Sequence, residues 1–263
     1  MVKEELIQRS PVRVLMKSIQ DDLRKSPGLG PGELGLIASP SGIGKTSVLV
    51  QIALDRLLQG SKVIHVSFTR HSDNVLLWYS NIFDEFIRSN RDIQLNKKSA
   101  EDGQEIKNEI VKNRVLMKFN QDGITVAQIV RSLQAMIRDG CFAAENIIVD
   151  GYKFSPDDGE NIGAFRNFAK ELGLCIWFSC NVGTHCAPDE PLFDRKKIPF
   201  VINGYADKFD VIAVLEPKQE PSEPAHIALT ISRKRGEVNP GQPALRLDPK
   251  TLLLLENPGF PHK

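Results

Sequence analysis

Apolar and polar positions along the chain follow two alternating periodicities. Short apolar runs rich in β-branched residues predict strands, whereas apolar residues three and four apart predict helices. The predicted strands cover residues 34–38, 62–68, 114–119, 146–150 and 175–180. The predicted helices cover residues 45–58, 75–87, 126–137 and 162–172. Nearly continuous apolar strands that alternate with helices favour a parallel sheet covered on both faces.

The pattern changes from Asp210 onward, where strand signals dominate and helical signals are few. Proline-containing segments separate these late runs. The late strand-like runs cover residues 210–216, 226–232, 244–248 and 251–256. We therefore expect an α/β fold: a mostly parallel, twisted sheet with helices on both faces and a C-terminal extension of antiparallel strands.

The connection after the first predicted strand carries the clearest chemical signal. Within LGLIASPSGIGKTSVLV, residues 34–50, the end of the phosphate-binding motif G-x-x-x-x-G-K-[ST] is matched by Gly44, Lys45 and Thr46. The first glycine of the motif is replaced by Ser39. An ordinary strand–turn–helix connection would explain the glycines, but it gives no reason for Lys-Thr directly after them.

Such a loop binds phosphate because backbone N–H groups converge at a helix N-terminus, where the helix dipole also favours an anion. The lysine would reach the β- and γ-phosphates of ATP, and the threonine hydroxyl would bind Mg²⁺. We therefore predict that ATP and Mg²⁺ are the cofactors. The predicted nucleotide-binding residues of the loop are Ser41, Gly42, Ile43, Gly44, Lys45, Thr46 and Ser47.

An acidic residue supports this interpretation. Asp150 ends the buried run NIIVD, and open α/β sheets bind their ligands at the carboxyl ends of the strands. This is the position of a Walker B aspartate, which holds Mg²⁺ through its water shell. Thr46 and Asp150 are therefore the predicted metal-binding residues.

The parallel core, the phosphate loop after the first strand, Asp150 at the fourth strand and the antiparallel C-terminal extension together resemble the RecA-type P-loop ATPases. The closest similarity is to the KaiC-like branch, alongside the RadA and DnaB branches, and it covers roughly residues 28–256. The strand and loop that lead into the phosphate loop of that branch are similar to PGELGLIASPSGIGKT. Its late strand, whose basic residues reach the neighbouring subunit, is similar to LTISRKRGE. The resemblance implies a ring or filament with ATP between protomers. It also implies that Arg233 and Arg235 reach a neighbour's nucleotide, although a solvated strand end explains them equally well.

The resemblance divides the chain into an N-terminal helical segment, residues 1–27, a RecA-like nucleotide-binding domain, residues 28–256, and a tail, residues 257–263. It further makes Asn181 a candidate sensor of the γ-phosphate, with loop capping as the alternative. The polar stretch 88–109 predicts a surface insertion with one short helix.

The sequence departs from the family where the water-activating acid is expected. KaiC-like members usually carry two glutamates after the second strand, whereas this chain has Thr69 and Arg70. Neither side chain can act as a carboxylate base, and the residue after Asp150 is Gly151. No catalytic residue is therefore assigned. We expect ATP binding with weak or absent hydrolysis, unless an acid comes from a neighbouring subunit.

Composition limits the partners. Lysine and arginine number 34 against 33 aspartate and glutamate residues, giving a net charge of +1 and no overall attraction to nucleic acid or to acidic membranes. The basic segment 193–200, FDRKKIPF, keeps DNA open as an alternative partner. Four cysteines and the lack of a signal or membrane-spanning stretch predict a cytoplasmic protein.

Three functions remain in competition. The first is a KaiC-like, homo-oligomeric ATP-binding switch or scaffold that acts on a protein partner. The second is an active DNA-dependent ATPase of the recombinase or helicase kind, and the third is a P-loop kinase. The arginine pair favours the first two, and the replaced glutamates favour the first.

Overall fold

The computed structural model describes residues 2–10, 12–20, 27–68, 73–90, 97–183, 191–219, 226–238 and 245–256. The strands are β1 (Leu34–Ser39), β2 (Val63–Ser67), β3 (Arg114–Lys118), β4 (Asn146–Asp150), β5 (Cys175–Asn181), β6 (Val211–Lys218), β7 (His226–Lys234), β8 (Glu237–Val238), β9 (Leu245–Leu247) and β10 (Leu254–Glu256). The helices are α1 (Val2–Gln8), α2 (Val12–Ser18), α3 (Lys45–Leu58), α4 (Asp73–Ser89), α5 (Lys97–Lys112), α6 (Val126–Arg138) and α7 (Gly159–Leu172), with 3₁₀ helices η1 (Gln121–Gly123) and η2 (Phe200–Lys208).

The described strands form one sheet in the order β10-β9-β7-β6-β1-β5-β4-β2-β3, with β8 paired to β7. The six strands from β6 to β3 run parallel, and the C-terminal strands extend the sheet with antiparallel pairing. The extension differs from the expectation in one respect. β6 pairs parallel with β1, so that Gly35 lies opposite Val211, and antiparallel pairing begins only at β7.

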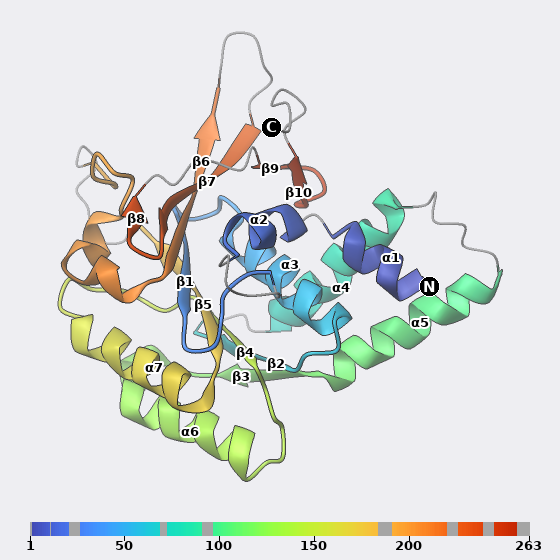
Figure 1. Cartoon of the computed structure of the whole chain (residues 1–263), viewed down its shortest axis with the longest axis horizontal. Helices are drawn as coiled ribbons and strands as arrows, with labels where there is room; N and C mark the ends of the chain where they lie inside the picture. Colours follow the sequence, from blue (N-terminus) through green and yellow to red (C-terminus); the bar gives the residue numbers. More distant parts are fainter. Residues whose placement is uncertain are drawn as a thin grey trace.

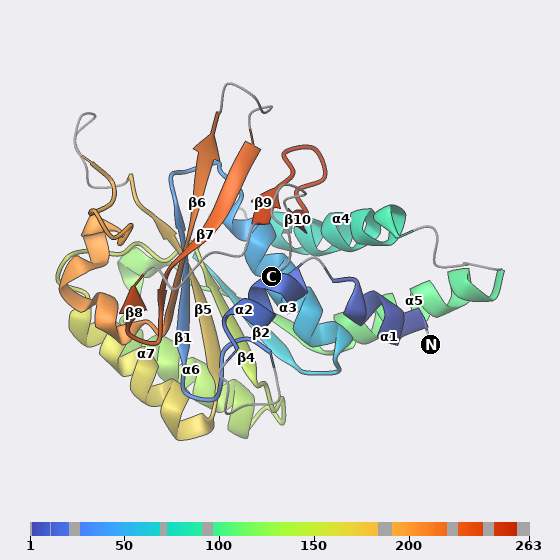
Figure 2. The same cartoon turned by 45° about the horizontal axis from the view of Figure 1, so that its top comes forward.

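Helices cover both faces of the parallel strands (Figures 1 and 2). Helices α1 to α5 contribute to one hydrophobic core, and α6, α7 and η2 contribute to the other. Strand β1 is buried along its whole length. Its Ile37 belongs to the first core, whereas Leu36 and Ala38 belong to the second, as the alternation of side chains along a strand requires.

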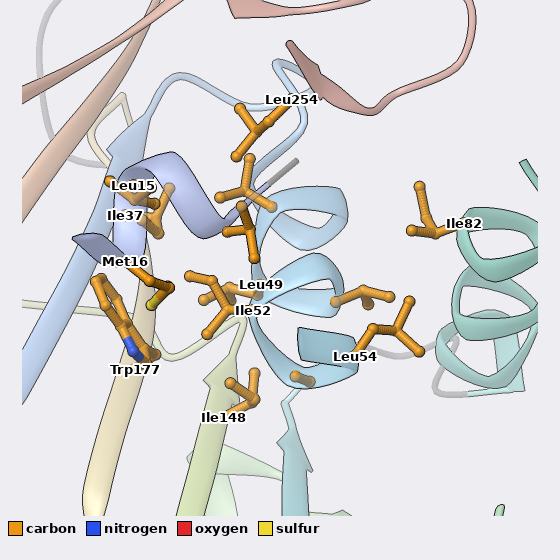
Figure 3. Packing of buried hydrophobic residues seen from close by; sticks show 14 of the residues in the cluster. Leu15, Met16, Ile37, Leu49, Ile52, Leu54, Ile82, Ile148, Trp177 and Leu254 are labelled. Atoms are coloured by element: carbon orange, nitrogen blue, oxygen red, sulfur yellow. The ribbon is translucent and has the colours of Figure 1, made fainter. Parts of the chain in front are cut away.

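The first core is close-packed around α2 and α3 (Figure 3). Leu15 and Met16 of α2 are fully buried, together with Leu49 of α3. Trp177 of β5 lies against the neighbouring strand at Gly35, where an added Cβ would come within 2.4 Å of the indole ring. The absence of a side chain at Gly35 therefore makes room for the tryptophan.

The helix in the polar stretch is longer than we expected. The prediction of a short helix within residues 88–109 is wrong in length, because α5 has 16 residues. Its Ile106 and Ile110 are buried in the first core, and Glu109 binds Lys3 of α1 at 2.6 Å. The helix is mostly polar because only one narrow face is buried. Among the described residues, no helix has the length and apolar character needed to cross a membrane.

Candidate nucleotide-binding site

The loop between β1 and α3 has the backbone geometry of an anion-binding loop. Gly42 and Gly44 have φ values of 79° and 111°, which are strained for any residue with a side chain. At Gly44 an added Cβ would also come within 2.4 Å of Leu247 Cδ2. Helix α3 begins at Lys45, so its unpaired N–H groups face the loop.

Lys45 is held inside this loop. Its Nζ donates hydrogen bonds to Ser39 O at 2.9 Å, to Ser39 Oγ at 3.1 Å and to Pro40 O at 2.7 Å. Burial lowers the pKa of Lys45 to about 8, against the opposing influence of Cys180 and Asp150. The serine that replaces the first glycine of the motif thus supplies one additional acceptor for the lysine.

Asp150 brings two distant segments to the loop. Its Oδ2 accepts a hydrogen bond from Thr46 Oγ1 at 2.9 Å, and its Oδ1 accepts one from Ser179 Oγ at 2.6 Å. The Ser179 hydroxyl in turn accepts from Gly151 N at 2.8 Å. The Asp150 carboxylate is only 3% exposed, so these contacts fix its orientation at the end of β4.

These groups border a cavity of about 520 Å³, a size suited to a nucleotide. The lining residues are Ser41, Gly42, Gly44, Lys45, Thr46, Ser47, Trp78, Asp150, Gly151, Tyr152, Lys153, Phe154, Ser179, Asn181 and Leu252. The phosphate loop and Asp150 supply the charged and polar groups. Trp78 supplies apolar surface from α4, and Leu252 supplies it from the connection between β9 and β10.

The donor set fits Mg²⁺. Thr46 and Asp150 offer a hydroxyl and a carboxylate, and Mg²⁺ prefers oxygen ligands while keeping several waters and the substrate phosphates. The two side chains are already within hydrogen-bond distance of each other, so one can bind the ion directly and the other through water. Bound Mg²⁺ would neutralise phosphate charge.

The structure brings together most of the residues that the sequence singled out. All predicted loop residues line the cavity except Ile43, which packs against the first core, and Asp150 and Asn181 line it too. Gly151 has a φ of 80°, so a glutamate after Asp150 would be strained there. Thr69 and Arg70 lie outside the described residues.

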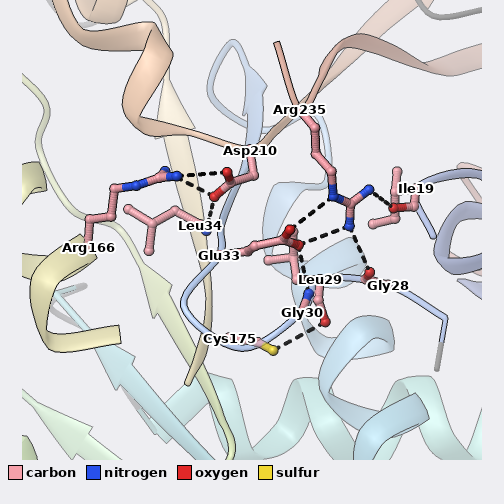
Figure 4. A network of polar contacts seen from close by, with 10 residues as sticks. All are labelled: Ile19, Gly28, Leu29, Gly30, Glu33, Leu34, Arg166, Cys175, Asp210 and Arg235. Carbon is pink, nitrogen blue, oxygen red and sulfur yellow. Dashed lines mark hydrogen bonds and ion pairs between the residues drawn. The ribbon is translucent and has the colours of Figure 1, made fainter. Parts of the chain in front are cut away.

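The two arginines lie at the opposite ends of the strands from the loop, because β7 is antiparallel to β6 and ends near the start of β1. Figure 4 shows Arg235 there. Arg235 binds Glu33 through two hydrogen bonds of 2.9 Å and donates to the carbonyl oxygens of Ile19 and Gly28. Its side chain therefore makes a network within its own chain. Arg233 makes no such bond within the described residues, and its Nε is buried without a partner.

Seven lining residues are not among the site residues that the sequence predicts: Trp78, Gly151, Tyr152, Lys153, Phe154, Ser179 and Leu252. Ser179 carries a weak signal, a polar residue two positions before Asn181 in a buried strand. Trp78 falls in the apolar repeat of the predicted helix 75–87, a pattern typical of core positions, but it is partly exposed and lines the cavity. Leu252 and Lys153 give no sequence signal that separates them from their neighbours.

The basic segment that kept DNA open forms an ordered turn. Phe193 and Pro199 form a β-bridge, and Asp194 accepts hydrogen bonds from the backbone of Lys196 and Ile198. Lys197 binds Glu216 at 2.6 Å. One of the three cations in the segment is therefore neutralised within the chain.

Comparison with known proteins gives a structural match. A KaiC-like protein from the hyperthermophilic archaeon Pyrococcus horikoshii is similar over 88% of this chain and 92% of its own, with a TM-score of 0.58 and 12% sequence identity. No protein-family model and no curated protein matches the sequence. The likeness confirms the predicted fold, a RecA-type α/β sheet with helices and antiparallel C-terminal strands.

Proposed function

We propose that this chain is a KaiC-like, RecA-type protein that binds Mg-ATP in the loop 41–47. It acts as a nucleotide-dependent switch or scaffold and hydrolyses ATP slowly or not at all. Its homo-oligomers hold ATP between protomers, and a protein partner responds to the nucleotide state. One observation carries the proposal: Lys45, Thr46 and Asp150 converge on a single cavity of about 520 Å³.

Each of these groups has a defined role in binding. The loop amides and Lys45 bind the β- and γ-phosphates, and Thr46 and Asp150 hold Mg²⁺, the latter through water. The contacts from Lys45 to Ser39 and Pro40 are made to neutral acceptors. A triphosphate is a far stronger partner for an ammonium group, so the lysine exchanges these contacts for the ligand's charge.

Slow hydrolysis follows from the residues that replace the acids. Thr69 and Arg70 stand where KaiC-like proteins carry glutamates, and the conformation of Gly151 disfavours an acid after Asp150. Loss of a general base lowers the rate by about 10²–10⁴-fold. Binding is largely retained, because it depends on the loop, Lys45 and the metal.

The test is a calorimetric titration with Mg-ATP and with a non-hydrolysable analogue, followed in the same samples by phosphate release and by oligomer size. Lys45→Ala should abolish binding. Lys62→Ala is the matched control, since Lys62 is outside the cavity and lies over the Phe142 ring at 5.2 Å. Trp78 provides a second readout, because its fluorescence should respond to the ligand, whereas Trp177 is buried in the core.

Binding with little phosphate release supports the proposal. Rapid release that single-stranded DNA accelerates would instead establish the DNA-dependent ATPase. Transfer of phosphate to an added acceptor, with little release to water, would establish the kinase. Equal binding by the wild type and Lys45→Ala would contradict the assignment of the site.

A further inference from the structure

The C-terminal hairpin, residues 245–256 with β9 and β10, lies against α3, the helix that follows the phosphate loop. β9 pairs with β7, and β10 pairs with β9 as the last strand on this side of the sheet, beside α3 (Figures 1 and 2). The side chain of Leu247 occupies the space next to Gly44, and Leu252 lines the cavity. The hairpin therefore forms a wall of the nucleotide site although it is more than 190 residues from the loop in sequence.

Gln51 fastens this hairpin to α3. Its Nε2 donates to Leu252 O at 2.9 Å, and its Oε1 accepts from Leu254 N at 2.9 Å. Ser47 adds a weaker bond to Leu252 O at 3.3 Å. Gln51 is 4% exposed, so both ends of its amide are committed to the hairpin in a buried environment where unpaired polar groups are costly.

The backbone at the fastened position is strained. Leu252 has a φ of 57°, a left-handed conformation that is uncommon for a leucine. Such conformations persist where surrounding contacts enforce them, and they concentrate at ligand sites. Here the enforcing contacts come from Gln51 and Ser47, and the result is an apolar side chain at the border of the cavity.

We propose that Gln51 is a positioning residue that holds Leu252 against the nucleoside part of the bound nucleotide. The inference rests on the proposed function and deepens it by assigning the two ends of the ligand to different parts of the chain. The loop, Lys45 and Asp150 bind the phosphate end of the nucleotide. Leu252 and Trp78 form an apolar wall that suits the planar base, which the polar groups of the loop do not contact.

The experiment compares Mg-ATP with Mg-tripolyphosphate, which has the phosphates but no nucleoside, by calorimetry. Gln51→Ala should weaken Mg-ATP binding about tenfold and leave tripolyphosphate binding within about twofold. Leu252→Ala and Leu252→Gly, which keep Gln51, should give the same split. Leu252→Gly also relieves the positive φ, so it should melt at a temperature no lower than Leu252→Ala.

Leu255→Ala is the matched control, because Leu255 is on the same hairpin, is exposed and does not line the cavity. It should leave both affinities unchanged. An equal loss of both ligands in Gln51→Ala, or no loss in any hairpin variant, would overturn the inference while the proposed function stands. A wild-type chain that binds neither ligand would overturn the proposed function itself.

Discussion

Ser179 shows how one side chain can set the geometry of the site. Its hydroxyl donates to Asp150 and accepts from Gly151 N, so it orients the carboxylate that faces Thr46. A hydrogen bond to a charged group contributes about 1.5–3 kcal/mol. Ser179→Ala should therefore weaken Mg-ATP binding by about tenfold or more, with little effect on binding measured in excess chelator.

Ser232→Ala is the control for this variant. Ser232 is buried on β7 and donates to Ile212 O at 3.2 Å, away from the cavity. Its loss should lower stability without a change in affinity. If Ser179→Ala weakened binding equally with and without Mg²⁺, Ser179 would support the loop in general rather than the aspartate.

His65 makes the stability of the chain depend on pH. The side chain lies within β2, where burial lowers its pKa from 6.5 to about 4, with Asp150 opposing the shift and Arg114 adding to it. Its Nδ1 lies 3.1 Å from the Tyr79 hydroxyl, and its Nε2 has no hydrogen-bond partner among the described residues. The folded chain therefore holds a neutral imidazole.

The direction in which the free energy of unfolding changes with pH follows from proton binding at His65. Between pH 6.5 and about 4 the unfolded chain binds a proton at His65 that the folded chain does not, so stability falls as the pH is lowered through this range. The full effect is roughly 3 kcal/mol. Denaturant unfolding at pH 7 and at pH 4.5 measures it, and His65→Asn, which cannot titrate there, should lose less stability on acidification. Equal losses would show that other groups cause the pH dependence.

At the scale of elements, Arg235 fastens the turn after β7 to the start of β1 and to the end of α2 (Figure 4). Glu33 is 8% exposed, and it would remain buried without its cation in Arg235→Ala. Breaking a buried ion pair on one side should cost about 3 kcal/mol of unfolding free energy. Denaturant unfolding measures this loss. An unchanged stability would favour the finger role predicted for Arg235.

The elements themselves were largely predictable, because strands buried on both faces and amphipathic helices carry strong periodic signals. The bounds of α3 and β4 agree with the prediction. Helix α5 was underestimated since its buried face is reduced to residues such as Ile106 and Ile110 within a polar stretch. The direction of β6 could not be read from its composition, because parallel and antiparallel strands with a buried run look alike.

The residues of the site also fall into two groups, those that a local sequence pattern predicts and those that it does not. The position of the loop 41–47 at the cavity could be predicted because the phosphate-binding motif has contiguous residues at fixed spacing, and that of Asp150 because it ends a buried strand. Ser179, Trp78 and Leu252 reach the cavity through tertiary packing alone. Their roles depend on strand order and on the docking of the hairpin, which no local pattern encodes.

At the scale of the molecule, the resemblance predicts assembly around the nucleotide. The Arg233 side chain makes no hydrogen bond or ion pair within the described residues, so it is the better candidate of the two arginines to contact a neighbour. Sedimentation velocity with and without a Mg-bound, non-hydrolysable analogue should show larger species only with the ligand. Arg233→Ala should reduce this assembly and leave stability unchanged. Assembly that is independent of the nucleotide would contradict an interface built around it.

The rate of ATP hydrolysis depends on a base that this chain lacks at residues 69 and 70. Under the proposed function, the loop, Lys45, Thr46 and Asp150 supply binding and charge stabilisation, and the replaced glutamates leave the site without a base. Thr69→Glu with Arg70→Glu should then raise the rate of phosphate release by about 10²-fold or more, with little change in Mg-ATP affinity. The matched variant Thr69→Gln with Arg70→Gln removes the arginine charge without adding a base, and it should remain slow. A gain in both double variants would mean that Arg70 restrains the site, and a gain in neither would mean that the barrier to hydrolysis is set elsewhere in the assembled protein.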